Sequence, residues 1–306
     1  MGLLDQIMRV ALPIIPKPVI WTVARRYVAG AELEDALARI RTLRSDGFGC
    51  ILDLLGEAVT SMAESEAAAA EYHRALEVLP SVDDSATISV KPTHMGAMLD
   101  REACETLLSG LCERAAEQGR RVRLEMEDAP TIDRTLEVFR SVRARHTNLG
   151  CVLQARLFRT ADDVAGLLAD GGELDVRLVK GIYLEPKEIA WTEDADICRS
   201  YRELAEQLVA GGAQVAFATH HSELADACVE IARSHGLVEG EAATRRYEFQ
   251  LLMGVRKDEA QRLAEAGHRV LIYVPYGRDW HAYTQRRLAR NPEIARHVMR
   301  AMFSRG

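Results

Sequence analysis

An alternation of short apolar segments and longer amphipathic segments runs through most of this chain. The apolar segments are rich in branched residues, and eight of them occur, at residues 49–55, 87–92, 121–127, 149–155, 175–181, 214–220, 247–253 and 269–275. Runs of this length and composition are typical of buried strands, and the segments between them have helical spacing. A strand followed by a helix, eight times in succession, predicts an α/β fold of the (β/α)8 TIM type, for which about 250 residues is typical.

Two of the intervening segments show how the helices are predicted. In residues 98–119, Leu99, Ala103, Leu107 and Leu111 recur at intervals of four, and Gly119 is expected to end the helix. Residues 63–79 are simply a strong helix-forming stretch. Because the chain has neither an internal repeat nor a linker, we predict one domain over 1–306, with an N-terminal helical arm over 1–45 and the barrel over 46–306.

The first twenty residues are apolar enough to raise the question of a membrane segment. Pro13, Pro16 and Pro18 interrupt the run, Asp5 lies near its start, and no small-residue cleavage site follows. These features argue against a signal peptide and against a membrane span. We predict an amphipathic helix followed by an extended arm that packs on the protein, with shallow attachment to a membrane surface as the alternative.

Charge and cysteine usage narrow the classes of function. The 306-residue chain has a formal net charge of -7, and its basic residues are scattered, so no basic face for nucleic acid is expected. The six cysteines form no CxxC pair, which favours buried reduced thiols over a disulfide framework or a zinc site. A cytoplasmic protein is therefore predicted.

Polar residues cluster where the predicted strands end. In barrels of this type the active site lies at the carboxyl ends of the strands, so these side chains are candidates for a site. They are Glu57, Lys91, Glu125, Glu127, Asp128, Gln154, Lys180, Tyr183, Thr219, His220, His221, Gln250 and Tyr273. Arg177, inside the apolar segment 175–181, is the strongest anomaly, because a buried positive charge needs an anionic or electron-rich partner. A structural ion pair with Glu125 and a functional role are both compatible with this position.

Two other chemistries are disfavoured by the motifs. His220 and His221 are adjacent and would point to opposite faces of a strand, no HxH pair occurs, and the carboxylates are not grouped as a metal-ligand set. No metal is therefore predicted. A nicotinamide cofactor is disfavoured because no GxGxxG motif follows a strand into a helix.

A series of motifs in this order resembles the proline dehydrogenase family, in its bacterial single-function form. They are DLLGEAV, ISVKPTH, RLEMEDAP, VLQA, VRLVKGIY, FATH, YEFQLLMG and YVPYGRDWHAYTQRRL, and the resemblance runs from about residue 49 to 291. The pairing of RLVKGIY with YxxRRL is its most specific part. The resemblance implies a distorted (β/α)8 barrel that binds FAD, oxidises L-proline to Δ1-pyrroline-5-carboxylate and passes the electrons to a quinone.

The resemblance also implies roles for individual residues. Substrate binding falls to Lys91, Tyr273, Tyr283, Arg286 and Arg287, with Tyr183 and Leu251 or Leu252 as further walls. Glu125 and Arg177 are the implied catalytic residues, and Glu57 is implied to pair with Arg286 as a gate. The implied flavin contacts are Met126, Gln154, Val179, Lys180, Gly181, Ile182, Thr219 and His220.

Spacing supports the grouping near the end of the chain. On a helix Tyr283, Arg286 and Arg287 would stand at i, i+3 and i+4 and so share one face, where two planar cations beside an aromatic wall suit a small ring with a carboxylate. A solvated basic helix end is the alternative.

Three residues depart from the family pattern. Glu125 stands where aspartate is usual, His221 where asparagine is common, and Arg290 where an acidic residue is common. The other functions considered are a dehydrogenase for a related cyclic imino acid such as hydroxyproline, and a barrel that binds a flavin or an amino acid without turnover.

Overall fold

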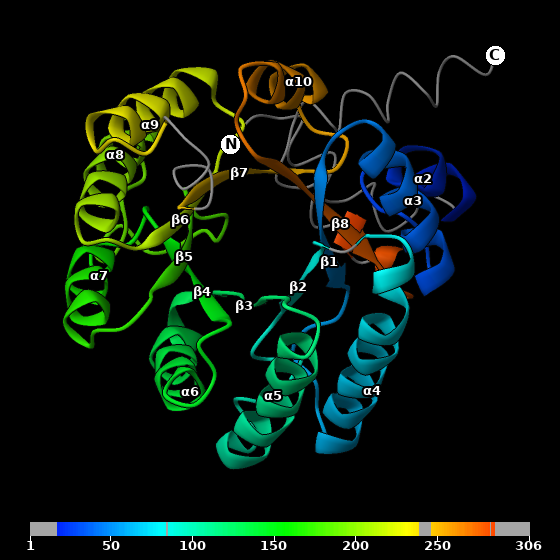
Figure 1. The fold of residues 1–306 in the computed structure, drawn as a ribbon. Coiled ribbons are helices and arrows are strands. Elements are labelled where there is room, and N and C mark those ends of the chain that lie inside the picture. Colours follow the sequence, from blue (N-terminus) through cyan, green and yellow to red (C-terminus); the bar gives the residue numbers. More distant parts are fainter. Residues whose placement is uncertain (1–16, 84, 239–245, 282, 285–306) are drawn as a thin grey trace.

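The computed structural model is a closed barrel of eight parallel strands in sequential order, β1 to β8 (Figure 1). It describes residues 17–83, 85–238, 246–281 and 283–284. The barrel closes through β1 and β8, where Gly49 pairs with Leu271 and Leu54 pairs with Tyr276. The predicted TIM-type α/β fold is confirmed.

Each strand coincides with one of the predicted apolar segments. The strands are β1 (Gly49–Leu54), β2 (Thr87–Val90), β3 (Val122–Leu124), β4 (Leu149–Gln154), β5 (Asp175–Val179), β6 (Gln214–Ala218), β7 (Tyr247–Leu252) and β8 (Val270–Tyr276). The largest difference is at β3, where we predicted 121–127. The backbone N–H of Glu125 still donates to the Val90 carbonyl at 2.9 Å, but the following residues leave the sheet for the rim.

Helices surround the barrel (Figure 1). Those in the described residues are α2 (Lys17–Ala24), α3 (Leu33–Ser45), α4 (Met62–Val78), α5 (Arg101–Ala116), α6 (Ile132–Arg143), α7 (Thr160–Ala169), α8 (Asp194–Ala210), α9 (Ser222–Ser234) and α10 (Lys257–Glu265). Two short 3-10 helices, η2 (Leu79–Ser81) and η3 (Ala129–Thr131), adjoin α4 and α6. Within the described residues no helix is both long and apolar enough to cross a bilayer.

The face of α5 that packs on the barrel differs from the predicted one. Leu99 precedes the helix and is 49% exposed, and of the predicted row only Leu111 is buried. The buried side chains are instead Cys104, Leu108, Ser109, Leu111, Cys112 and Ala115. The prediction was wrong because it followed a single row at intervals of four, whereas the buried face is wider and includes the small side chains of Cys104, Ser109, Cys112 and Ala115.

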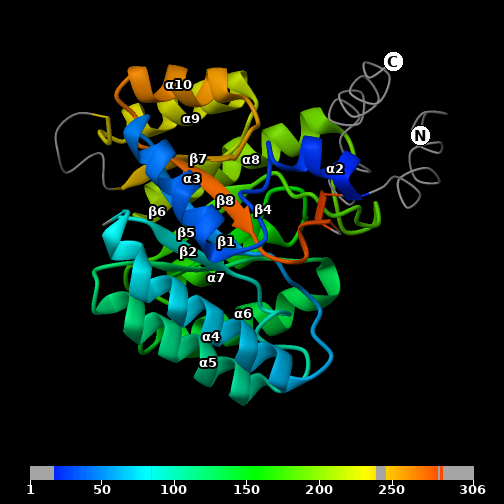
Figure 2. The ribbon, with the colours of Figure 1, turned by 90° about the vertical axis from the view of Figure 1, so that its right-hand side faces the viewer.

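Helix α3 is one of the helices that surround the barrel, although it precedes the first strand in the sequence. It packs against both β1 and β8, and Figure 2 shows it lying across these strands. Leu33, Ala36, Leu37 and Ile40 are its buried residues. The segment assigned to an N-terminal arm therefore covers the seam of the barrel.

Helix α2 lies where the sequence predicted extended chain. The helix begins at Lys17 and so includes Pro18. Proline lacks a backbone N–H, and a first helical turn tolerates this because the N–H groups of that turn have no acceptor within the helix. The Trp21 ring meets that of Trp280 edge to face at 4.7 Å, which brings α2 against the residues after β8. The earlier part of the predicted amphipathic helix lies outside the described residues.

Candidate active site

A cavity of about 620 Å³ opens at the carboxyl ends of the strands. A cavity of this size is ample for a small-molecule or cofactor site. The described residues with an implied catalytic, substrate, gate or flavin role line it: Glu57, Lys91, Glu125, Met126, Gln154, Arg177, Val179, Lys180, Gly181, Ile182, Thr219, His220, Tyr273 and Tyr283. The strand-end candidates Glu127, His221 and Gln250 also line it, whereas Asp128 does not. Tyr183, Leu251 and Leu252 line it as well. The structure thus brings the predicted residues together, and their individual roles stay predictions.

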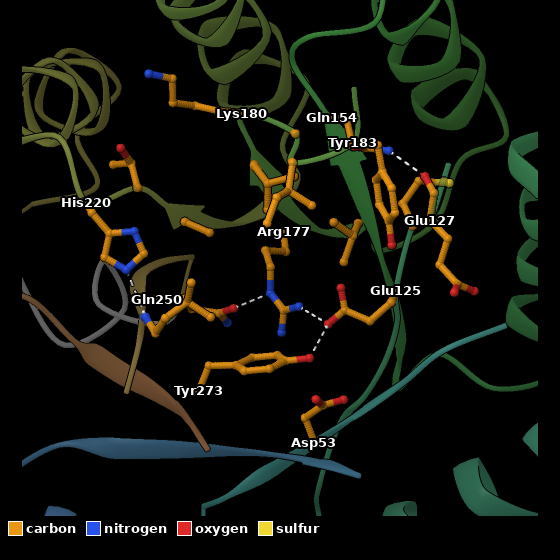
Figure 3. A pocket seen from close by; sticks show the side chains of 18 of the residues that line it. Asp53, Glu125, Glu127, Gln154, Arg177, Lys180, Tyr183, His220, Gln250 and Tyr273 are labelled. Atoms are coloured by element: carbon orange, nitrogen blue, oxygen red, sulfur yellow. Dashed lines mark hydrogen bonds and ion pairs between the residues drawn. The ribbon is translucent and has the colours of Figure 1, made fainter. Parts of the chain in front are cut away.

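Arg177, on β5, lies at the centre of the cavity (Figure 3). Its side chain is buried, with Nη1 donating to Glu125 Oε1 and Nε donating to Gln250 Oε1. The guanidinium carbon lies 5.2 Å from the centre of the Tyr273 ring, and the Tyr273 hydroxyl donates to Glu125 at 3.2 Å. The ion pair with Glu125 that the sequence allowed is therefore present.

This arrangement keeps Glu125 and Arg177 charged. Burial alone would raise the pKa of Glu125, but the charge of Arg177 and the hydrogen bond from Ser89 together lower it. Burial likewise opposes the charge on Arg177, yet Glu125 raises the pKa of the guanidinium. The centre of the cavity therefore holds a fixed positive charge and a fixed negative charge, both out of bulk water.

Asp53, on β1, is a site residue that the sequence analysis did not select. It is 1% exposed, and its Oδ1 accepts a hydrogen bond from Lys91 Nζ at 2.7 Å. Burial raises the pKa of Asp53. Burial lowers the pKa of Lys91, but the charge of Asp53, its hydrogen bond and the charges of Glu125 and Glu127 together outweigh burial, and the net shift is upward. The signal was available, because an aspartate inside an apolar strand segment is as anomalous as Arg177.

The rim formed by β4 to β7 has polar groups around a glycine. Gly181 has φ +98, and a Cβ built on it would lie 3.1 Å from Gln154 Oε1. Gln154 Nε2 donates to the Glu127 carbonyl at 2.8 Å, and His220 Nε2 accepts from the Leu252 N–H at 3.0 Å. Glycine is therefore the residue that suits this position, where the backbone itself lines the cavity.

Similarity to known proteins decides the family. The family model described as Proline dehydrogenase matches residues 36–300. The chain belongs to the proline dehydrogenase family. The resemblance seen in the sequence motifs is thereby confirmed.

Several relatives support this assignment. The chain is 35% identical to proline dehydrogenase of Deinococcus radiodurans over 287 residues, which cover 92% of this chain and 90% of that protein. It is 29% identical to proline dehydrogenase 1 of Bacillus subtilis over 282 residues, covering 92% of this chain and 91% of the relative. These relatives are single-function bacterial proline dehydrogenases of similar length.

A solved structure shows the same fold. Proline utilization A from Bdellovibrio bacteriovorus, inactivated by N-propargylglycine, superposes with a TM-score of 0.79 at 23% identity. The match covers 88% of this chain and 32% of that one, so this chain spans about a third of the length of that protein. At this identity the likeness concerns the fold.

Part of the substrate site predicted from the proline dehydrogenase motifs lies outside the described residues. Arg286 and Arg287 fall there, as does Arg290, so the predicted shared helix face with Tyr283 and the gate between Glu57 and Arg286 stay predictions. Tyr283 itself is described, lies in a helical turn and lines the cavity.

The sequence did not predict one group of three side chains that lies at the rim of the cavity. Asp194, Cys198 and His221 place ligand-type atoms within 4.8 Å of one another. Cys198 Sγ lies 3.8 Å from His221 Nδ1, while Asp194 also pairs with Lys180. Cys198 and the other five cysteines are free and buried, as predicted.

Proposed function

We propose that this chain uses FAD to oxidise L-proline to Δ1-pyrroline-5-carboxylate and passes the electrons to a quinone, the first step in converting proline to glutamate. Membership of the proline dehydrogenase family supports the reaction. The single observation that carries the proposal is the buried Arg177 in the middle of the barrel. Arg177 forms an ion pair with Glu125, and its guanidinium group lies over the Tyr273 ring. A site that must stabilise negative charge on an electron-accepting ring needs such a cation.

The residues present at the β4–β7 rim fit a flavin. Gly181 is the clearest sign, because it lines the cavity with a φ of +98, where any other residue would be strained and its Cβ would crowd Gln154 Oε1 at 3.1 Å. Gln154, Lys180, Gly181, Thr219 and His220 would hold the cofactor, with Met126, Val179 and Ile182 as apolar contacts. FAD, when bound, would accept the two electrons removed from the substrate.

The opposite side of the cavity suits the substrate. Lys91 supplies a positive charge for a carboxylate, and Tyr273, Tyr283 and Leu251 supply walls for an apolar ring. We assign Arg286 and Arg287 to the same carboxylate and Glu57 to the gate. Tyr273 occupies the space that a larger, hydroxylated ring would need, which favours proline over hydroxyproline.

Lys91 acts as a charged clamp in this proposal and not as a nucleophile. Its ion pair with Asp53 keeps the amine protonated, and a protonated amine cannot attack carbon. Borohydride treatment during turnover should therefore leave no adduct mass on Lys91.

The cellular setting belongs to the same proposal. We place the chain in the cytoplasm as one barrel domain with an N-terminal helical arm. A quinone dissolved in the bilayer would be reached by shallow contact with the inner membrane surface, for which the apolar residues 1–20 are the candidate segment.

Turnover assays test the function directly. Purified protein supplied with L-proline and a soluble quinone should reduce the quinone and release a product that o-aminobenzaldehyde traps as a coloured adduct. Quinone reduction should not occur with D-proline or without an amino acid. Bound flavin without any proline-dependent quinone reduction would instead support a barrel that binds its ligands without turnover.

A further inference from the structure

Asp53 has one carboxylate oxygen to which no residue in the described part of the chain donates a hydrogen bond. Lys91 binds Oδ1 at 2.7 Å, whereas Oδ2 is buried and has no hydrogen-bond partner within the described part of the chain. The neighbouring Tyr273 hydroxyl also lowers the pKa of Asp53, but a phenol has one proton, and Tyr273 already donates to Glu125. A buried carboxylate oxygen without a donor is costly, so a donor is expected to come from a ligand.

The position of Asp53 limits what that ligand can be. Asp53 lies near the carboxyl end of β1 and lines the cavity, on the side where Figure 3 shows Tyr273 and Glu125. Its carboxylate therefore borders the space proposed for the substrate. A donor reaching Oδ2 must be small and positively charged or strongly polar, because apolar atoms would leave the oxygen unsatisfied.

Asp53 and Lys91 together present a negative and a positive group side by side. An α-amino acid carries the reverse arrangement, with an ammonium and a carboxylate separated by a single carbon. When an amino acid binds with its carboxylate facing Lys91 and its ammonium facing Asp53, each charge meets one of opposite sign. Glu125 also lines the cavity, but three donors, Ser89, Arg177 and Tyr273, already meet at its Oε1.

We propose that Asp53 Oδ2 accepts a hydrogen bond from the ring ammonium of the substrate, and that Asp53 thereby selects an amine over an uncharged ring of the same shape. The proposal rests on the proposed function, because it assumes a cyclic amino acid in this cavity. The alternative is that Asp53 serves only to hold Lys91 in place.

The two alternatives differ in the ligands that they affect. Tetrahydrofuran-2-carboxylate has the shape and carboxylate of proline but an oxygen in place of the ring amine. If Asp53 contacts the amine, Asp53→Asn should weaken proline selectively. If Asp53 only positions Lys91, both ligands should weaken by the same factor.

The experiment is a calorimetric titration of the flavin-loaded protein after anaerobic reduction with dithionite, a state in which proline binds without turnover. For Asp53→Asn we expect the Kd of proline to rise roughly 10- to 100-fold more than the Kd of the oxygen analogue, the loss of a hydrogen bond to a charged group. Lys91→Gln is the matched control, because it removes the carboxylate partner and should weaken both ligands equally.

A double variant covers the case in which Asp53→Asn does not fold. Asp53→Asn with Lys91→Gln leaves neither buried charge unpaired, and it should discriminate less between proline and the analogue than Lys91→Gln alone. Equal weakening of both ligands by Asp53→Asn, or no change in either, would overturn the assignment of Asp53. Failure of the wild type to bind proline would instead count against the proposed function.

Discussion

At the scale of single residues, the cavity is defined by charges that are buried and paired. Arg177 with Glu125, and Lys91 with Asp53, place two cations and two anions in a space closed off by the barrel. Ion pairs of this kind contribute little net stability, because removing charges from water offsets their attraction. These ion pairs instead hold the charged side chains in fixed positions before the proposed substrate and cofactor bind.

Tyr273 provides a test of specificity at this scale. Replacing Tyr273 with serine removes the wall beside the ring, so the ratio of kcat/KM for trans-4-hydroxyproline to that for proline should rise roughly tenfold or more. Steady-state kinetics with both substrates measure the ratio. Tyr276→Phe is the control, because Tyr276 is on the same strand but its hydroxyl faces Glu71 at 3.3 Å, away from the cavity. An unchanged ratio in Tyr273→Ser would remove Tyr273 from the substrate site.

His94 provides a test of pH dependence. Burial, assisted by the charge of Lys91, lowers the pKa of His94 to about 4 in the folded protein, against an ordinary value near 6.5. Because the unfolded chain takes up the proton first, the free energy of unfolding should fall as the pH drops from 6.5 towards 4, by up to about 3 kcal/mol. Above pH 6.5 His94 should contribute no pH dependence.

Urea unfolding of the wild type and of His94→Gln across this range measures the effect. The variant should lose stability less steeply than the wild type on acidification. Parallel curves for the two proteins would show that His94 titrates normally.

At the scale of elements, β3 and α5 show what could be predicted from the sequence. All eight strands were located from branched apolar runs, because a strand inside a barrel is buried on both faces and leaves a continuous signal. The predicted ends of the strands were less accurate. Glu125, for example, lies within the predicted segment 121–127, but in the structure β3 ends at Leu124 and Glu125 lies at the rim of the cavity. The buried face of α5 was missed because alanine, serine and cysteine give weak signals.

The candidate site was predictable for a related reason. Residues at the carboxyl ends of barrel strands must meet, so a list of polar residues at those ends becomes a site once the fold is known. Asp53 lies inside its strand, so a list of residues at the strand ends omits it, although the reasoning that selected Arg177 inside β5 applies equally to Asp53. The rim grouping of Asp194, Cys198 and His221 was missed because it joins the start of one helix to a distant loop.

Helix α3 gives a prediction at this scale. It covers the seam between β1 and β8, and Ile40 on its inner face is fully buried. Ile40→Ala should lower the free energy of unfolding by about 2–5 kcal/mol, because the helix cannot collapse into the space left behind. Arg41→Ala, on the exposed side of the same helix, should change it by less than about 0.5 kcal/mol. Urea denaturation compares them, and equal values would mean that α3 is not part of the core.

At the scale of the whole molecule, the closed barrel explains why chemistry is confined to one end. The large core of the fold is apolar, and the cavity at the carboxyl ends takes its polar groups from strands spread along the sequence. The N-terminal helices complete the wall beside β8 and contact the chain that follows it. The molecule is thus built so that substrate and cofactor would meet around Arg177.

The most direct test of this account is the visible spectrum of the purified protein mixed with L-proline in the absence of oxygen. The account predicts a flavin spectrum that bleaches fully with about one equivalent of proline, since each substrate molecule gives up two electrons. The colour should return when a quinone is added. A flavin spectrum unchanged by excess proline, or a protein that binds no flavin when supplied with FAD, would contradict it.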